Sequence, residues 1–263
     1  AITAAMEGGT GLTDFEKEFP DRFVDVGICE ENAAGMAAGL AIGGSKPVFA
    51  VYSTFLQRAI DQLIVNNALM NLDVVFAIDR AGLVGADGPT HHGMFDLVYT
   101  RMVPNMRVLA PSNEAELVNS LHTALALGGP FAVRYPRGEA CGVPVPDESQ
   151  TYEPGVSRLV REGSDVAILA FGNMVAPAIE AAAALGDAGL SVRVVDMRWV
   201  KPLDIEAIRR AAETRLVVAV EDGVIEGGVG EEVLAELARQ DAKVPVLTLG
   251  IPDRYIMQGA PDF

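Results

Sequence analysis

The stretch FVDVGICEENAAGMAAGLAIGGSKPVFAVYS, residues 23–53, decides the fold class of this chain. It begins and ends with short apolar runs, at 23–28 and 47–53, that read as buried strands. The segment between them, 31–44, reads as a helix whose alanines and glycines let a neighbour approach closely. Two strands joined by a helix form a βαβ unit, which predicts a parallel sheet.

The same alternation continues through nearly all 263 residues and indicates an α/β fold with helices covering parallel sheets. A helix is predicted from Phe55 to about Met70. Residues 2–9 and 13–19 are predicted to be short helices, the second with a capping box from Thr13 to Glu16. Further strands are predicted at 73–79, 107–111, 130–136, 166–172, 191–198, 215–222 and 244–251.

Residues 138–155, GEACGVPVPDESQTYEPG, interrupt the alternation. They are rich in proline, glycine and polar residues and have no clear period, which is typical of a connecting segment. We therefore predict two parallel-sheet domains, at 1–140 and 157–263, joined by a linker at 141–156. A chain of this length is sufficient for two such cores.

The charge of the chain argues against several function classes. Thirty-six acidic and 20 basic residues give a formal net charge of -16, which would repel nucleic acid or an anionic membrane surface. No apolar run reaches a membrane-spanning length, and no basic export signal is present. Only Cys29 and Cys141 occur, too few for a disulfide framework, so we expect a cytoplasmic protein. The chain starts at Ala1 without a methionine, and we expect it to be part of something longer.

Polar residues directly after predicted strands are the first candidates for a functional site. In open parallel sheets the ligand crevice lies beyond the carboxyl ends of the strands. The first predicted domain has five such places, which we expect to face one crevice: 29–32, 52–55, 79–80, 85–93 and 135–138. The second domain offers less, at 172–173, Arg198 and 221–222. Its segment GGVGEE, 227–232, lacks the remaining residues of a phosphate loop and reads as a glycine turn.

The loop GADGPTHHG, 85–93, holds two of the three histidines. Histidine and aspartate are good zinc ligands, but adjacent histidines tend to point apart and no further ligand completes a metal site. A second interpretation makes one histidine an acid/base group, with Asp87 orienting it or carrying a second proton. A structural loop with a solvent-exposed histidine is the third interpretation.

Six stretches together are similar in order and spacing to a known family. The chain resembles the 1-deoxy-D-xylulose-5-phosphate synthase family over nearly its whole length, and YSTFLQRA and DRAGLVGADG are specific to that family. The glutamate segment is shared more widely with transketolases and with beta subunits of pyruvate dehydrogenase-type enzymes. The stretches are DVGICEENAAGMAAGLAIGGSKPVFAVYSTFLQRAIDQ, FAIDRAGLVGADGPTHHGMFDL, GPFAVRYPRG, RWVKPLD, VEDGVIEGGVG and LGIPD.

The resemblance implies a fold, an activity and a cofactor. The fold is the pyrimidine-binding domain followed by the C-terminal domain of a transketolase-like thiamine diphosphate enzyme. The family condenses pyruvate with glyceraldehyde 3-phosphate and releases carbon dioxide; its product feeds isoprenoid, thiamine and pyridoxal biosynthesis. By resemblance, Glu30 hydrogen-bonds the aminopyrimidine ring from an apolar pocket, and Phe55 stacks on that ring. Glu31 and Asn32 stand where the family commonly has Gln-His.

The resemblance also implies a substrate site. Arg80 and Arg137 would bind the aldehyde phosphate, because a guanidinium group matches phosphate geometry and stays charged. His91 and Asp87 would carry protons, and His92 would be a neighbour. The residues that fall on substrate-lining positions of the family are Tyr52, Arg58, Arg80, Asp87, His91 and Arg137.

One expected element is missing from the sequence. The family holds the diphosphate and Mg²⁺ through a Gly-Asp-Gly run, which these 263 residues lack. We therefore expect an N-terminal domain or companion subunit to carry that site, and a homodimer as the assembly. Other readings are a transketolase-like or 2-oxoacid dehydrogenase beta-type subunit, or a noncatalytic partner module.

Overall fold

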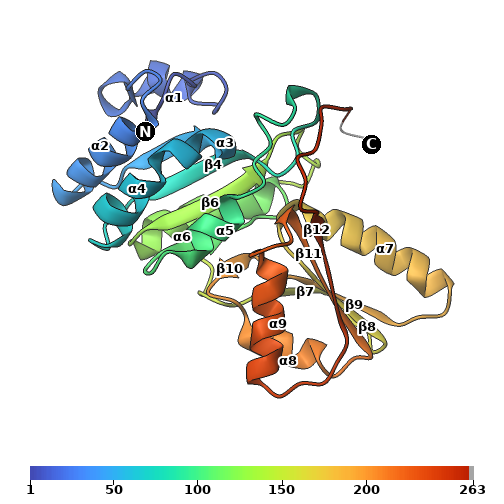
Figure 1. The fold of residues 1–263 in the computed structure, drawn as a ribbon. Helices are drawn as coiled ribbons and strands as arrows, with labels where there is room; N and C mark the ends of the chain where they lie inside the picture. Colours follow the sequence, from blue (N-terminus) through green and yellow to red (C-terminus); the bar gives the residue numbers. More distant parts are fainter. Residues whose placement is uncertain (261–263) are drawn as a thin grey trace.

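The computed structural model describes residues 1–260, which form two sheets covered by helices (Figure 1). The first sheet has seven strands in the order β10-β5-β6-β4-β3-β1-β2, and all neighbours are parallel except β10 and β5. Its strands are β1 (Ile2–Thr3), β2 (Val24–Asp25), β3 (Val48–Tyr52), β4 (Val75–Ala81), β5 (Arg107–Leu109), β6 (Phe131–Pro136) and β10 (Trp199–Lys201).

Helices cover both faces of the first sheet. Alternate side chains of β4 divide between the faces: Phe76 and Ile78 join one apolar cluster, and Val75 joins another that includes Ala124 of α6. The helices of this part are α1 (Thr13–Glu18), α2 (Glu30–Ile42), α3 (Ser53–Leu56), α4 (Ile60–Gln62), α5 (Asp96–Met102) and α6 (Glu114–Leu127). Short 3-10 or π turns complete it at η1 (Pro20–Arg22), η2 (Gln57–Ala59), η3 (Leu63–Ala68) and η4 (Gly85–Asp87).

The second sheet has five strands in the order β12-β11-β8-β9-β7, with only β7 antiparallel to its neighbour. α7 covers one face, and α8 and α9 cover the other. The elements are β7 (Arg158–Arg161), β8 (Val166–Ala170), η5 (Gly172–Met174), α7 (Val175–Asp187), β9 (Val192–Asp196), α8 (Ile205–Ala211), β11 (Leu216–Val224), α9 (Val229–Arg239) and β12 (Val246–Ile251).

The two sheets share one apolar core. A single cluster of buried side chains runs from Phe49 of β3 through Leu97 of α5 to Leu169 of β8 and Val229 of α9. Strand β10 strengthens this connection, because it belongs to the second half of the chain by sequence but pairs with β5 of the first sheet. The ring of its fully buried Trp199 lies 6.1 Å, centroid to centroid, from the ring of Phe131. The shared core and the pairing of β10 with β5 therefore hold the two sheets together.

Several local expectations differ from the structure. Residues 2–9 are not helical: Ile2 and Thr3 form β1 between β2 and β3, since burial of Ile2 in the sheet outweighs local helix preference. α1 has Leu12 at its N-cap position and no side-chain cap, so the predicted capping box is wrong. The helix predicted from Phe55 to about Met70 is divided among α3, η2, α4 and the π-helical η3. No helix among residues 1–260 is long and apolar enough to cross a membrane.

Candidate active site

The candidate site lies along the carboxyl edge of the first sheet. β3 ends at Tyr52, whose register partner on β4 is Asp79. Arg80 follows with a backbone φ of 55°, in the left-handed region that non-glycine residues rarely adopt. β6 ends at Pro136 and leads directly to Arg137. Because parallel neighbours end at the same edge, these strands bring their terminal side chains together.

Glu30 is buried at the start of α2. Its side chain is 2% exposed, and Ala33 and Ala34 on the same helix are fully buried. Arg58 Nη1 donates a hydrogen bond to Glu30 Oε1 at 2.5 Å. The neighbouring Glu31 is exposed. Of the two adjacent carboxylates, the structure therefore buries only Glu30, and an arginine neutralises it.

Aromatic rings connect this carboxylate to the strand ends. Tyr52 and Phe55 stack with ring centroids 5.5 Å apart and an interplanar angle of 16°. The guanidinium of Arg58 lies 5.0 Å from the Phe55 centroid, and that of Arg80 lies 4.2 Å from the Tyr52 centroid. His91 packs edge-on against Phe55 at 5.6 Å. His91 and Arg58 therefore both contact the ring of Phe55.

Asp87 joins two arginines at the other end of the network. Its Oδ2 lies 2.7 Å from Nη1 of Arg80 and 2.7 Å from Nη1 of Arg137. The Arg137 side chain is 43% exposed and that of Arg80 is 22% exposed. Two cationic groups therefore share one carboxylate at this edge of the sheet.

The structure brings together all the residues that the sequence analysis assigned to the site. Each contacts another member of the set through a salt bridge, a hydrogen bond or an aromatic contact. The connected set is Glu30, Arg58, Phe55, Tyr52, His91, Arg80, Asp87 and Arg137.

Asp79 is a further ionisable group at this edge. Burial raises the pKa of Asp79 to about 6, although the backbone N–H and the charge of Arg80 act in the opposite direction. Its Oδ1 accepts a hydrogen bond from the Arg80 N–H at 2.6 Å. Burial also raises the pKa of Tyr52 and of Tyr135, and the Asp79 charge adds to both effects. The sequence analysis placed Asp79 and Tyr135 at strand ends but gave neither a role.

The loop that presents Asp87 and His91 is closed at its base. Gly82 and Gly93 exchange two backbone hydrogen bonds, both 2.8 Å long. His92 is buried, and its Nδ1 accepts a hydrogen bond from the Val84 N–H at 3.1 Å. His92 therefore has a structural contact inside the loop.

His91 has a different environment from its neighbour. Its Nδ1 lies 2.9 Å from Thr90 Oγ1, and its ring is only partly buried against Phe55. No group of three or more His, Cys, Asp or Glu side chains among residues 1–260 has a metal-holding arrangement. His91 therefore lies beside Phe55 at the candidate site and has no metal-ligand cluster around it in the described residues.

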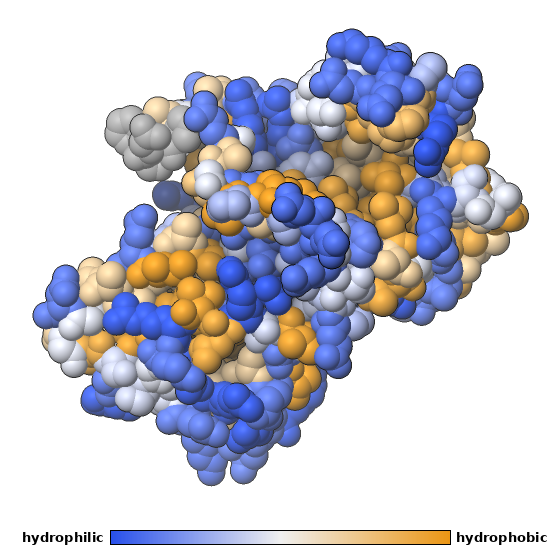
Figure 2. Space-filling model, turned by 180° about the vertical axis from the view of Figure 1, so that it is seen from behind, coloured by the Kyte–Doolittle hydropathy of each residue, from blue (hydrophilic) through white to orange (hydrophobic). Residues whose placement is uncertain are grey.

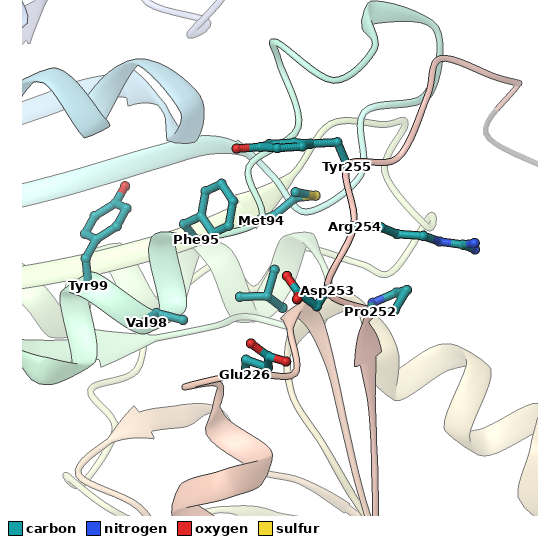
Figure 3. Close-up of a pocket in the computed structure, with 10 residues that line it drawn as sticks. Met94, Phe95, Val98, Tyr99, Glu226, Pro252, Asp253, Arg254 and Tyr255 are labelled. Atoms are coloured by element: carbon teal, nitrogen blue, oxygen red, sulfur yellow. The ribbon is translucent and has the colours of Figure 1, made fainter.

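Two cavities lie near the junction of the sheets. One, of about 400 Å³, adjoins the network and is lined by Asp79, Arg80 and Arg137 together with Asn113, Tyr135 and Asn173. The other, of about 490 Å³, lies between α5, the end of β11 and residues 252–255, and contains none of the eight predicted residues (Figure 3). The smaller of these two cavities therefore includes two of the eight predicted residues, Arg80 and Arg137.

The residues present fit one part of thiamine diphosphate. A buried carboxylate on an alanine-rich helix and a partly exposed aromatic ring, both in contact with Arg58, suit a flat nitrogen heterocycle. Ser53 Oγ, on the helix turn that carries Phe55, is buried without a partner in the described part of the chain. The sequence has no Gly-Asp-Gly run for Mg²⁺ and diphosphate. Glu30 and Phe55 could hold the aminopyrimidine.

Two family models match this chain. The family model for the transketolase pyrimidine binding domain matches residues 1–142, and the model for the transketolase C-terminal domain matches residues 155–263. A 1-deoxy-D-xylulose-5-phosphate synthase from Chlorobium luteolum is 53% identical over 262 residues, covering 99% of this chain and 42% of the relative. The enzyme of that name from Vibrio vulnificus is 50% identical over 263 residues, covering 100% and 42%. The chain thus spans about two fifths of the length of these curated relatives.

Solved structures are similar as well. A split gene transketolase, described as an inactive beta4 tetramer, has a TM-score of 0.86 and 34% identity, covering 96% of this chain and 83% of that one. The transketolase from Campylobacter jejuni has a TM-score of 0.78 at 21% identity, which shows a shared fold, covering 98% and 40%. From the two matched domains, this chain belongs to the transketolase family, of which it contains the pyrimidine-binding and C-terminal domains.

Proposed function

We propose that this chain is the pyrimidine-binding and C-terminal part of a 1-deoxy-D-xylulose-5-phosphate synthase. The whole enzyme would condense pyruvate with glyceraldehyde 3-phosphate and release carbon dioxide. The observation that carries the proposal is the single network that runs from the buried Glu30 to Arg137 at the carboxyl edge of the first sheet. Relatives with that name at about 50% identity support it.

Glu30 and Phe55 would hold the aminopyrimidine of thiamine diphosphate. When bound, the cofactor supplies the electron sink that carbon–carbon bond chemistry requires. The Glu30 carboxyl group would hold a proton at a ring nitrogen, which its burial favours because water does not compete for the contact. Arg58, hydrogen-bonded to Glu30 Oε1, fixes the orientation of that carboxyl group.

Arg80 and Arg137 would bind the phosphate of the aldehyde substrate. Both are now paired with Asp87 Oδ2, at 2.7 Å each. A phosphate dianion would compete for the two guanidinium groups, because charge-assisted contacts to phosphate are strong and geometrically matched. Binding would then release Asp87 from at least one arginine and free its carboxylate for proton handling.

His91 would exchange protons with the reacting carbon chain. The Thr90 hydroxyl beside Nδ1 fixes the ring orientation, and the edge contact with Phe55 keeps the imidazole next to the expected cofactor position. Imidazole is suited to this task because it titrates near neutral pH. Asp87, on the same loop, would act as its partner.

The assembly is part of the proposal. A segment or subunit with the Mg²⁺–diphosphate site must join this chain; the related split gene transketolase chain is described as inactive in its beta4 form, which supports such a division of labour. We also propose a homodimer, because α2 and the following helical segment carry exposed apolar side chains: Leu40, Ile42, Val65, Leu69 and Met70. Figure 2 shows that apolar surface is gathered in patches on one face of the molecule. The free, exposed Cys29 and Cys141 suit the cytoplasm.

A second candidate function is a transketolase-like subunit that acts on ketose phosphates. The structural similarity at 34% identity to a split gene transketolase favours it. The two candidates differ in substrate, since only the synthase consumes pyruvate.

The decisive assay combines this chain with a polypeptide that carries the Mg²⁺–diphosphate site. Thiamine diphosphate, Mg²⁺, pyruvate and glyceraldehyde 3-phosphate are added, and released carbon dioxide is measured. Release that requires both polypeptides supports the synthase. Turnover of ketose phosphates without use of pyruvate supports the second candidate. No turnover by folded, associated polypeptides would indicate a noncatalytic partner module.

A further inference from the structure

The end of β11 contacts both ends of the loop that carries Asp87 and His91. On one side, Asp222 Oδ1 accepts a hydrogen bond from the Leu83 N–H at 3.4 Å. On the other side, the Val224 N–H donates to the Met94 carbonyl at 3.0 Å. Two neighbouring positions of the second sheet therefore hold the two sides of the loop base.

The contact between Asp222 and Gly82 is especially close. A Cβ on Gly82 would lie 1.7 Å from Asp222 Oδ2, so only a glycine allows the carboxylate to occupy this place. Gly82 also has a φ of +74°, which other residues rarely adopt. Since Gly82 pairs with Gly93 across the loop base, a carboxylate pressed against Gly82 restrains both strands of the base.

Asp222 is itself held firmly. It is buried, and Asn173 Nδ2 donates to its Oδ2 at 3.0 Å. Arg134 Nη2 donates to the Asp222 carbonyl at 2.9 Å, while the guanidinium of Arg134 pairs with the buried Asp96. A buried carboxylate is costly unless its partners are well placed, and here they come from both sheets.

We propose that Asp222 is a positioning residue for the active-site loop. It acts from the second sheet, fixes the base of residues 82–93, and so keeps Asp87 and His91 at the edge of the first sheet. This assignment gives the C-terminal domain a task in the site without any contact to substrate. It rests on the proposed function only in naming Asp87 and His91 as the groups that act.

The test measures amide hydrogen exchange of this chain, without cofactor or substrate. Asp222→Ala should accelerate exchange at Leu83, Val84 and Gly93 by about 10- to 100-fold, because a partly buried hydrogen bond to a charged group is lost and the contact against Gly82 is removed. The matched control is Asp196→Ala. Asp196 is also a buried carboxylate, at the end of β9, but it bonds to Ser112 and Arg158 and not to the loop. The control should leave exchange in the loop unchanged.

Two further variants separate positioning from general instability. Asp222→Asn retains an oxygen acceptor for the Leu83 N–H and should restore most of the protection; exchange as fast as in Asp222→Ala would contradict the assignment. Gly82→Ala disturbs the same contact from the loop side and should accelerate loop exchange even if Asp222→Ala does not fold. Unchanged exchange at Leu83 and Gly93 in the folded variants would overturn the proposal.

The assembled enzyme gives an independent readout. Asp222→Ala should lower kcat about 10-fold or more and change the affinity for thiamine diphosphate less than 2-fold, because Glu30 and Phe55 are not held by Asp222. A loss of cofactor affinity equal to the loss of kcat would count against a positioning role. If the wild-type assembly has no synthase activity but loop exchange responds to Asp222→Ala, the proposed function fails and the positioning role stands.

Discussion

The first prediction concerns Asp79, which sits beside Arg80 at the end of β4. Burial raises the pKa of its carboxyl group from the ordinary 3.8 to about 6 in the folded chain. The folded state therefore retains a proton that the unfolded state has lost, at pH values between these two. Stability contributed by this group is complete below about pH 4 and is lost as pH rises through about 6.

The magnitude follows from the size of the pKa change. A rise from 3.8 to about 6 corresponds to about 3 kcal/mol of unfolding free energy, lost once the group is fully ionised. Asp79→Asn removes the charge but retains an oxygen that can accept the Arg80 N–H bond. The variant should therefore have an unfolding free energy up to about 3 kcal/mol higher than wild type at pH 8. As pH falls from 7.5 to 5, this difference in unfolding free energy should shrink by about 1 kcal/mol or more.

Urea unfolding of both proteins from pH 5 to pH 8 measures this difference. The control is Asp14→Asn, because the Asp14 side chain is 98% exposed and its replacement should change stability little at any pH. The reasoning is refuted if Asp79→Asn is no more stable than wild type at pH 8, or if its advantage does not depend on pH.

Three further predictions follow from single contacts. Arg137→Ala should raise KM for glyceraldehyde 3-phosphate at least about 10-fold and leave KM for pyruvate nearly unchanged; equal effects in steady-state kinetics contradict a phosphate role. Phe55→Ala should weaken thiamine diphosphate binding about 10-fold in calorimetry, whereas unchanged affinity would exclude ring stacking. Asp204→Ala should lower the unfolding free energy by about 1–2 kcal/mol, because Asp204 caps α8 through Ala207 and binds Ser157; an unchanged urea midpoint would argue against the cap.

Much of the fold follows from the sequence pattern. The longer buried strands, such as β8 at Val166–Ala170, are continuous apolar runs, and local periodicity is sufficient to predict them. The prediction of an α/β fold with two sheets is confirmed, and each sheet is parallel except for one antiparallel edge strand. β1 and β10 have two and three residues and exist only because neighbouring strands pair with them. Such pairing is a tertiary effect that no local pattern reveals.

The candidate site is predictable in part for a physical reason. Strand ends of a parallel sheet lie at one edge, so polar residues after separate strands can be expected to meet there. The individual contacts are not predictable in this way: the pairing of Glu30 with Arg58, and the sharing of Asp87 by two arginines, depend on side-chain geometry. The sequence analysis noted Asp222 at a strand end but gave it no role, because its contacts with Leu83 and Arg134 join segments far apart in the sequence.

The catalytic role of the buried Glu30 is the central claim. Its most direct test measures carbon dioxide release from pyruvate by the assembled enzyme, with Glu30→Gln compared to Glu31→Gln. Since Glu30 is buried in the network and Glu31 is exposed, Glu30→Gln should abolish turnover with little loss of fold, and Glu31→Gln should be mild. Retained turnover in a folded Glu30→Gln enzyme, or a larger loss in Glu31→Gln, would contradict the account.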